Sequence, residues 1–210
     1  DFRGLLKLKD SETLRLVYRS TREFTDINNL AEGYIFRNYN SFFQGNPNLE
    51  AAFFNRINLN YQSINIFNFT NIFANLSYSV RDNAIQNTTQ VEGINSIRTA
   101  TNSNFPRETY TASGRIDKRS KNLKGGLSIN YNFSDFNNVI NDNPTASSNF
   151  TQRFSANIAT NFRTKPNIEI GYTYSIRDYK TGGVESKFFT DAPYVRLDAY
   201  FLNGFVFNVK

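Results

Sequence analysis

Between residues 50 and 81, apolar and polar residues alternate along two arms that a short turn near residue 69 separates. The apolar positions of the arms are Phe53, Ile57, Leu59 and Tyr61, and then Ile72, Ala74, Leu76, Tyr78 and Val80. Polar residues such as Arg56, Asn58 and Asn75 stand between them. Successive side chains of a strand point to opposite faces, so a period of two indicates β-strands. The pattern predicts an antiparallel hairpin.

The length of these arms distinguishes them from the strands of most soluble proteins. Each arm spans roughly 15 residues, whereas a usual strand has about 5 or 6. A strand tilted by about 45° crosses the hydrocarbon of a bilayer with roughly 9 to 11 residues, and barrels of the outer membrane combine such strands with one apolar and one polar face. The hairpin therefore predicts transmembrane strands.

The same alternation predicts further strands along the whole chain. We expect them at residues 2–9, 13–20, 107–118, 123–137, 149–163, 167–179, 188–201 and 205–209. Tight turns are expected near residues 11, 69, 120, 166 and 203, and longer loops at 21–49, 82–106, 138–148 and 181–187. Outer-membrane barrels alternate short periplasmic turns with long external loops in this way. The predicted fold class is all-β, an antiparallel transmembrane β-barrel.

Arginine follows the polar positions of these strands. The residues concerned are Arg15, Arg19, Arg56, Arg81, Arg115, Arg153, Arg163, Arg177 and Arg196. An arginine on the lipid face at mid-bilayer costs about 2–4 kcal/mol, so a membrane selects for this separation. A soluble β-sandwich or β-solenoid also alternates and is the other fold to consider. Its strands would be shorter, and its loops would not alternate in length.

The composition argues against a transmembrane helix and against a nucleic-acid-binding protein. The chain has 210 residues, the size of one all-β domain, and no run of about 18 apolar residues that would form a transmembrane helix. Its mean hydropathy of -0.52 suits a barrel, because half of each strand faces a wet interior. The formal charge of +6 does not predict nucleic-acid binding, because the basic residues are scattered rather than clustered.

One motif resembles a known family. Gly45, Asn46, Pro47, Asn48 and Leu49 read GNPNL ahead of the first long arm. The motif resembles the GNP-x-L signature that precedes a barrel strand in TonB-dependent receptors and related outer-membrane proteins of Bacteroidetes-type bacteria, and residues 14–30 resemble the preceding strand and loop. The family often continues with Pro-Glu, whereas this chain continues with Glu50, Ala51 and Ala52. A turn before a strand also explains these residue types.

The resemblance implies a barrel of some 22 strands, filled by an amino-terminal plug, that imports large scarce nutrients through the TonB system. About ten strands and no plug or TonB-contact segment are found here, so we expect residues 1–210 to form a single barrel segment of a larger outer-membrane barrel. The implied partners are outer-membrane lipid, the remaining barrel and plug, TonB and a surface lipoprotein. Two alternatives stay open: a structural or secretion-associated barrel without TonB-driven transport, and a soluble carbohydrate-binding β-protein.

The sequence predicts no catalytic, cofactor-binding or metal-binding residue and names no ligand-binding residue. The chain has neither His nor Cys, which removes the commonest general base, metal ligand and thiol nucleophile. We therefore expect no enzyme. The carboxylates of Asp117, Glu169 and Asp198 stand on the polar positions beside Arg115, Arg177 and Arg196, which predicts ion pairs in the barrel interior. Gly125 and Gly126 predict a bend or a close approach of strands.

Overall fold

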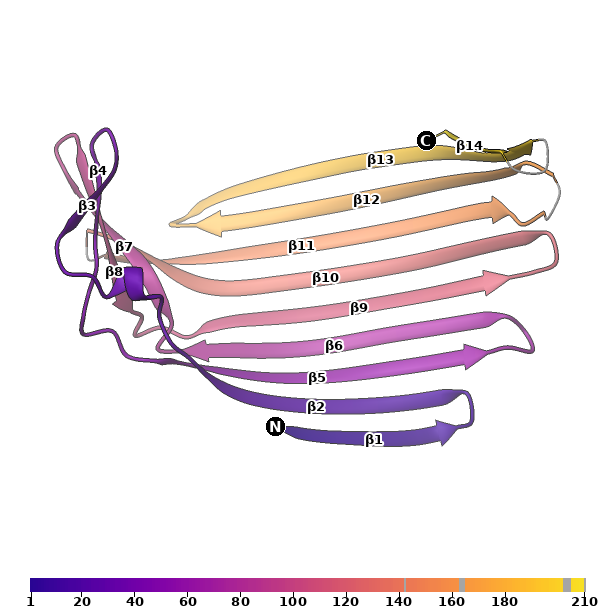
Figure 1. The fold of residues 1–210 in the computed structure, drawn as a ribbon, viewed down its shortest axis with the longest axis horizontal. Helices are drawn as coiled ribbons and strands as arrows, with labels where there is room; N and C mark the ends of the chain where they lie inside the picture. Colours follow the sequence, from indigo (N-terminus) through magenta and orange to yellow (C-terminus); the bar gives the residue numbers. More distant parts are fainter. Residues whose placement is uncertain (142, 163–164, 202–204, 210) are drawn as a thin grey trace.

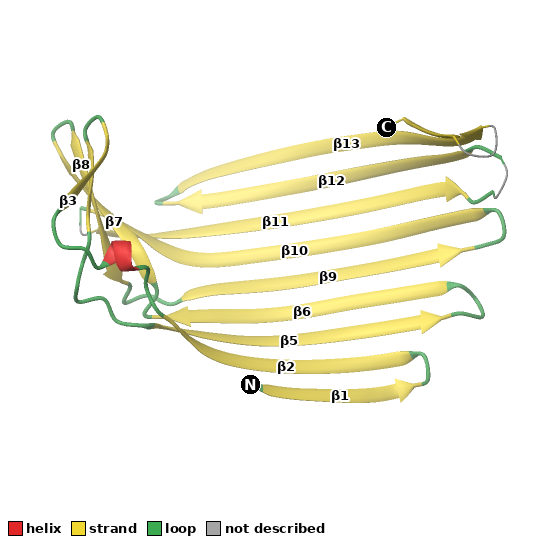
Figure 2. Ribbon diagram, viewed as in Figure 1, coloured by secondary structure: helices red, strands yellow, loops and turns green. Residues whose placement is uncertain are grey.

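A computed structural model describes residues 1–141, 143–162, 165–201 and 205–209. These residues form one 14-stranded sheet, with a single turn of 3-10 helix, η1 (Ile27–Asn29), beside it (Figures 1 and 2). No helix in the described part of the chain is long and apolar enough to span a membrane. The predicted all-β, antiparallel architecture is confirmed.

Long antiparallel strands make up the main path of the sheet (Figure 1). In their order across the sheet they are β1 (Phe2–Lys9), β2 (Glu12–Glu23), β5 (Ala52–Asn65), β6 (Thr70–Asp82), β9 (Arg107–Arg119), β10 (Leu123–Ile140), β11 (Asn143–Thr160), β12 (Asn167–Thr181), β13 (Val184–Phe201) and β14 (Phe205–Val209). The strands β1 and β14 each pair with one neighbour, so the described sheet is open at both edges.

Off this path, two hairpins lie at one end of the sheet, opposite the turns that follow β1, β5 and β9 (Figure 1). They are β3 (Tyr34–Asn38) with β4 (Ser41–Gln44), and β7 (Ile85–Glu92) with β8 (Asn95–Asn102). The two hairpins join through a parallel pairing of β4 with β8, and β7 touches the end of β10 at the pair Thr89–Ile140. Together with η1 they form what we call the cap.

The register separates an apolar face from a polar face. One row across β2, β5, β6, β9 and β10 reads Leu16, Leu59, Leu76, Ala112 and Tyr131, and the next row reads Val17, Asn58, Ser77, Thr111 and Asn132. Side chains of the first row remain solvent-exposed, with 53% of Leu76 accessible. The buried apolar residues of the described chain are small apart from Phe43, so no second layer covers the apolar face. This single layer is unlike a soluble sandwich, which buries one face of each sheet.

The apolar band runs obliquely across the sheet. In β2 it covers residues 14–18, and in β12 it covers 168–176. The row that contains Leu14, at one limit of the band, reaches Tyr174 and then Asp191 at the far side of the sheet. Strands that tilt against a barrel axis are staggered in this way, so that a level band crosses successive rows.

Two connections that the sequence predicts as loops are tight turns instead. The strands β10 and β11 stay paired to Ile140 and Asn143, and β12 and β13 stay paired to Thr181 and Val184. The second turn consists of Gly182 and Gly183, both at positive φ (53° and 82°). Beyond the apolar band the alternation ends, because Val139 and Ile140, and likewise Phe188 and Phe189, are adjacent and stand on opposite faces, although the backbone pairing continues. The loop predictions at 138–148 and 181–187 were therefore wrong.

The longer connections at 21–49 and 82–106 are those that build the cap. Within the second of them, residues 85–92 and 95–102 form the paired strands β7 and β8 rather than an irregular loop. The other predicted long strands appear within a few residues of their expected limits. The predicted turn at Asn203 and Gly204, and the polar-face placement of Arg163, lie outside the described residues.

Candidate functional site

The polar face carries far more basic than acidic side chains. Its basic residues in the described strands are Arg3, Lys7, Arg15, Arg19, Arg56, Arg81, Arg107, Arg115, Arg119, Lys124, Arg153, Arg177 and Arg196. Its acidic residues are Glu23, Asp117, Glu169 and Asp198. The placement of arginine on polar positions is thereby confirmed for every predicted residue except Arg163. The face as a whole is positively charged.

Several of these basic residues lie directly opposite one another on neighbouring strands. The pairs are Arg19–Arg56, Arg81–Arg107 and Arg119–Lys124. Like charges in directly opposed positions destabilise a sheet. Such pairs are tolerated where other groups compensate the charge.

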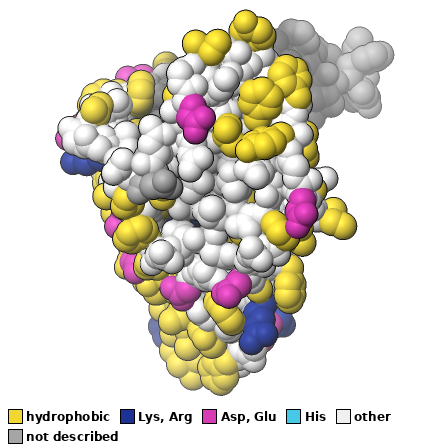
Figure 3. All heavy atoms as spheres, turned by 90° about the vertical axis from the view of Figure 1, so that its left-hand side faces the viewer, with side chains coloured by type: hydrophobic (Ala, Val, Ile, Leu, Met, Phe, Trp, Pro, Cys, Tyr) yellow, Lys and Arg dark blue, Asp and Glu magenta, His cyan; other side chains and the backbone are white. Residues whose placement is uncertain are grey.

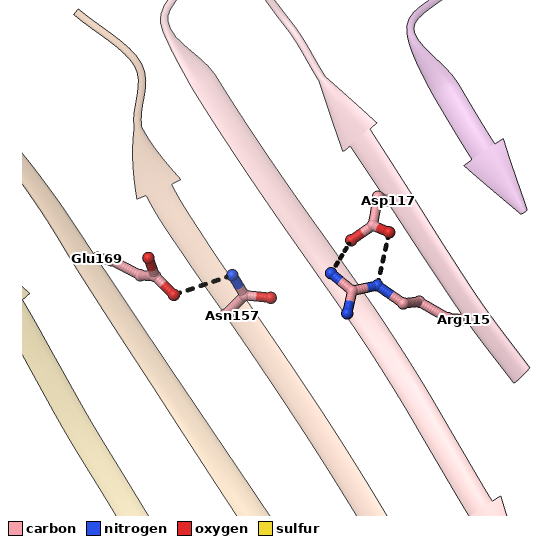
Figure 4. Close-up of polar contacts among 4 residues, drawn as sticks. All are labelled: Arg115, Asp117, Asn157 and Glu169. Atoms are coloured by element: carbon pink, nitrogen blue, oxygen red, sulfur yellow. Dashed lines mark hydrogen bonds and ion pairs between the residues drawn. The ribbon is translucent and has the colours of Figure 1, made fainter. Parts of the chain in front are cut away.

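Two ion pairs form between the carboxylates and arginines that the sequence places together. The carboxylate of Asp117 accepts two hydrogen bonds from Arg115, one from Nε at 2.6 Å and one from Nη2 at 2.9 Å (Figure 4). Glu169 lies 3.8 Å from Nη1 of Arg196. Arg177 makes no ion pair within the described residues, because its neighbours across the two strand pairs are Thr151 and Phe188.

Glu169 is the centre of a wider polar network. Its Oε1 accepts hydrogen bonds from Nδ2 of Asn157, at 3.2 Å (Figure 4), and from the hydroxyl of Tyr194, at 2.6 Å. The ring of Tyr194 crosses over Gly171, where a Cβ atom would collide with the ring. The sequence analysis missed Tyr194 and Gly171, because only the register of β12 with β13 shows that they are opposed.

At Gly126, one of the two glycines for which a bend or a close approach of strands is predicted, polar side chains of both neighbouring strands come close. Gly126 lies in register between Asp117 and Asn157. A Cβ atom there would come within 2.7 Å of Oδ1 of Asp117 and 2.8 Å of Oδ1 of Asn157. The missing side chain leaves room for the two polar groups on either side.

These residues line a recess on the polar face, at the end of the sheet with the tight turns. Its volume is about 610 Å³, within the range of small-molecule sites. The lining includes Arg115, Asp117, Arg119, Lys124 and Glu169. Among the described residues no group of acidic side chains is suited to hold a metal ion.

The cap is fixed to the long strands by an asparagine. Oδ1 of Asn102 accepts the backbone N–H of Glu50 at 2.8 Å, and Nδ2 donates to the carbonyls of Glu50 and Asn83 at 2.9 and 3.0 Å. One side chain therefore joins the end of β8 to the segments that enter β5 and β7. Ala52, Ala84 and Ala100, which lie near these residues in the chain, are buried.

The GNPNL motif has a structural role here. A Cβ atom on Gly45 would collide with the backbone of Ala31, so only glycine allows this approach. The N–H of Asn46 donates to the carbonyl of Asn29 at 2.6 Å, and its Oδ1 accepts the N–H of Asn48 at 2.9 Å. The motif holds the chain against η1 before it enters β5.

The outer surface of the cap is mainly uncharged polar, with gathered apolar side chains and separate acidic ones (Figure 3). Tyr39, at the tip of the β3–β4 hairpin, is 85% exposed. Other strongly exposed apolar residues of the cap are Phe24, Ile27, Tyr34, Phe36 and Ile94. Exposed aromatic and amide side chains on a supported loop are suited to contact a ligand or a partner.

The model of the outer membrane protein beta-barrel family matches residues 5–196. This chain belongs to that family. No curated protein and no solved structure matches it. As a barrel of the bacterial outer membrane, it turns its apolar face to lipid and its polar face to the barrel interior. The soluble alternative is thereby excluded.

Proposed function

We propose that residues 1–210 form a single segment of the wall of a larger barrel, of about 22 strands, in a TonB-dependent receptor-like transporter that imports a large nutrient. The open sheet supports this proposal. Unpaired edges of β1 and β14 cannot face lipid, because their backbone groups would lack hydrogen-bond partners. Further strands, a plug, TonB and a surface lipoprotein are the proposed partners, and the wall itself has no catalytic role.

The observation that carries the proposal is the combination of a polar interior wall with a cap over one end. A barrel of this size encloses a lumen wide enough for a plug and a passing solute. The cap is joined to the strands by hydrogen bonds from Asn102, so it is a supported surface rather than a free loop. We assign first contact with the nutrient to its exposed aromatic residues. We assign the opposite end of the sheet, with the turns that follow β1, β5 and β9, to the periplasmic side.

Uptake in cells tests the function. The complete protein is produced in a strain that lacks its own copy, and growth on single polymeric nutrients is compared with and without a functional TonB system. We expect loss of growth on the same nutrient when either the barrel or TonB is removed.

A matched variant separates recognition from assembly. Replacing Tyr39 and Tyr34 of the cap by serine should reduce uptake while the amount of heat-resistant folded barrel stays unchanged. If TonB is dispensable and loss of the barrel only makes cells sensitive to detergents, a structural or secretion-associated role replaces import.

A further inference from the structure

The recess at the turn end of the interior face contains one pair of opposed basic residues that has no ion-pair partner among the described residues. Arg119 of β9 and Lys124 of β10 are directly opposed in the register, and both side chains are exposed. The other opposed pairs have partners, since Arg19 and Arg81 form ion pairs with Asp1 and Glu23. Within the described residues, neither Arg119 nor Lys124 forms an ion pair or lies over an aromatic ring.

The acidic groups of the recess are already engaged. Both carboxylate oxygens of Asp117 accept hydrogen bonds from Arg115. Glu169 accepts from Tyr194 and Asn157 and lies near Arg196. Glu169 also interacts with the charge of Lys124 at longer range. Among the described residues, however, no carboxylate lies at ion-pair distance from Arg119 or Lys124, so both side chains can contact an external anion.

The surrounding residues leave space for such an anion. The next residue in the row after Lys124 is Ala159, which is small and only 3% exposed, and Gly125, which lines the recess, has no side chain. The volume of about 610 Å³ exceeds what a single phosphate or carboxylate group needs, so the group can belong to a larger molecule.

We propose that Arg119 and Lys124 bind a phosphate or carboxylate group of a solute in the barrel interior. This inference rests on the proposed import function and names its substrate class as anionic. The planar guanidinium of Arg119 can donate two parallel hydrogen bonds to such a group, and Lys124 adds a point charge from the opposite strand. Binding of the anion also relieves the repulsion between the two side chains.

Calorimetry on the complete protein in detergent tests the site, with tripolyphosphate as the probe. The variant Arg119→Gln/Lys124→Gln should bind the probe roughly 10- to 100-fold more weakly, since it loses two charge-assisted contacts. The control Lys121→Gln/Lys165→Gln removes the same charge from exposed turn positions outside the recess and should bind as the parent does. Heat resistance on gels shows whether each variant is folded. Arg119→Lys keeps the charge but loses the two parallel hydrogen bonds of the guanidinium, so its affinity should lie between those of the parent protein and the double variant.

The proposal is overturned if the parent protein does not bind tripolyphosphate, or if the control variant loses as much affinity for tripolyphosphate as the double variant does. It is also overturned if the protein binds only an acidic hexaglutamate peptide, which would identify a protein segment as the occupant. The uptake experiment stands apart from these results. Import of neutral polymers alone would leave the proposed import function intact and refute the anionic substrate class. Tripolyphosphate binding without any TonB-dependent uptake would leave the anion site intact and refute the import function.

Discussion

An arginine in place of Leu76 should destabilise the protein strongly, because this residue lies on the lipid face near the middle of the bilayer. The strand β6 has 13 residues, and Leu76 lies midway between Thr70 and Asp82. At about 3.3 Å per residue and a tilt of about 45°, the strand spans about 30 Å along the membrane normal, which matches the hydrocarbon thickness. Leu76 is then about 14 Å from either interface, too far for an arginine to reach water easily.

The expected cost of Leu76→Arg is about 2–4 kcal/mol, which is roughly 30- to 1,000-fold in the unfolding equilibrium constant. Its neighbour Ser77 lies on the interior face, in register with Asn58 and Thr111. Ser77→Arg should therefore change the free energy of unfolding by less than about 0.5 kcal/mol. Guanidinium unfolding of the complete protein from phospholipid vesicles, followed by circular dichroism, measures both values. Equal costs at the two positions would refute the assignment of the faces.

Other variants test the contacts described above. Gly171→Ala should cost about 1–3 kcal/mol of thermal stability, because its methyl group meets the ring of Tyr194, and the additional change Tyr194→Ser should recover part of that loss. Asn102→Ala should cost about 1–3 kcal/mol of local stability and speed proteolysis within the cap but not within the long strands; uniform cleavage would contradict the anchoring role. On intact cells, an impermeant thiol reagent should label Asn95→Cys and not Lys165→Cys, and the opposite result would reverse the sidedness of the barrel.

The alternation of residues determined much of the fold without any tertiary information. It located the long strands and divided their side chains between two faces, because a period of two follows from the geometry of the strand itself. It also predicted that Leu127, Ile129, Tyr131 and Phe133 share a face with residues of the preceding strand, and the register of β10 with β9 confirms this. The bias of arginine toward one face was visible for the same reason.

The sequence could not show where a strand continues after its apolar face ends. Beyond the apolar band, apolar and polar residues stop alternating. In β10 the polar Asn137 and Asn138 are followed by the adjacent apolar residues Val139 and Ile140, which leaves no period of two to detect. The cap was hidden for a related reason. Its parallel pairing of β4 with β8 joins Ser41 to Ser96, residues far apart in the chain, and no local pattern encodes such a contact.

The register between long strands decided the candidate site. The sequence places Arg119 and Lys124 on either side of a turn, but only the pairing of β9 with β10 shows that they are directly opposed. Likewise, Gly171 and Tyr194 are distant in sequence and become neighbours because β12 pairs with β13. A shift of the strand register by one residue would turn these side chains to the lipid face. The apolar band that the sequence specifies therefore fixes the register, and the register brings the residues of the site together.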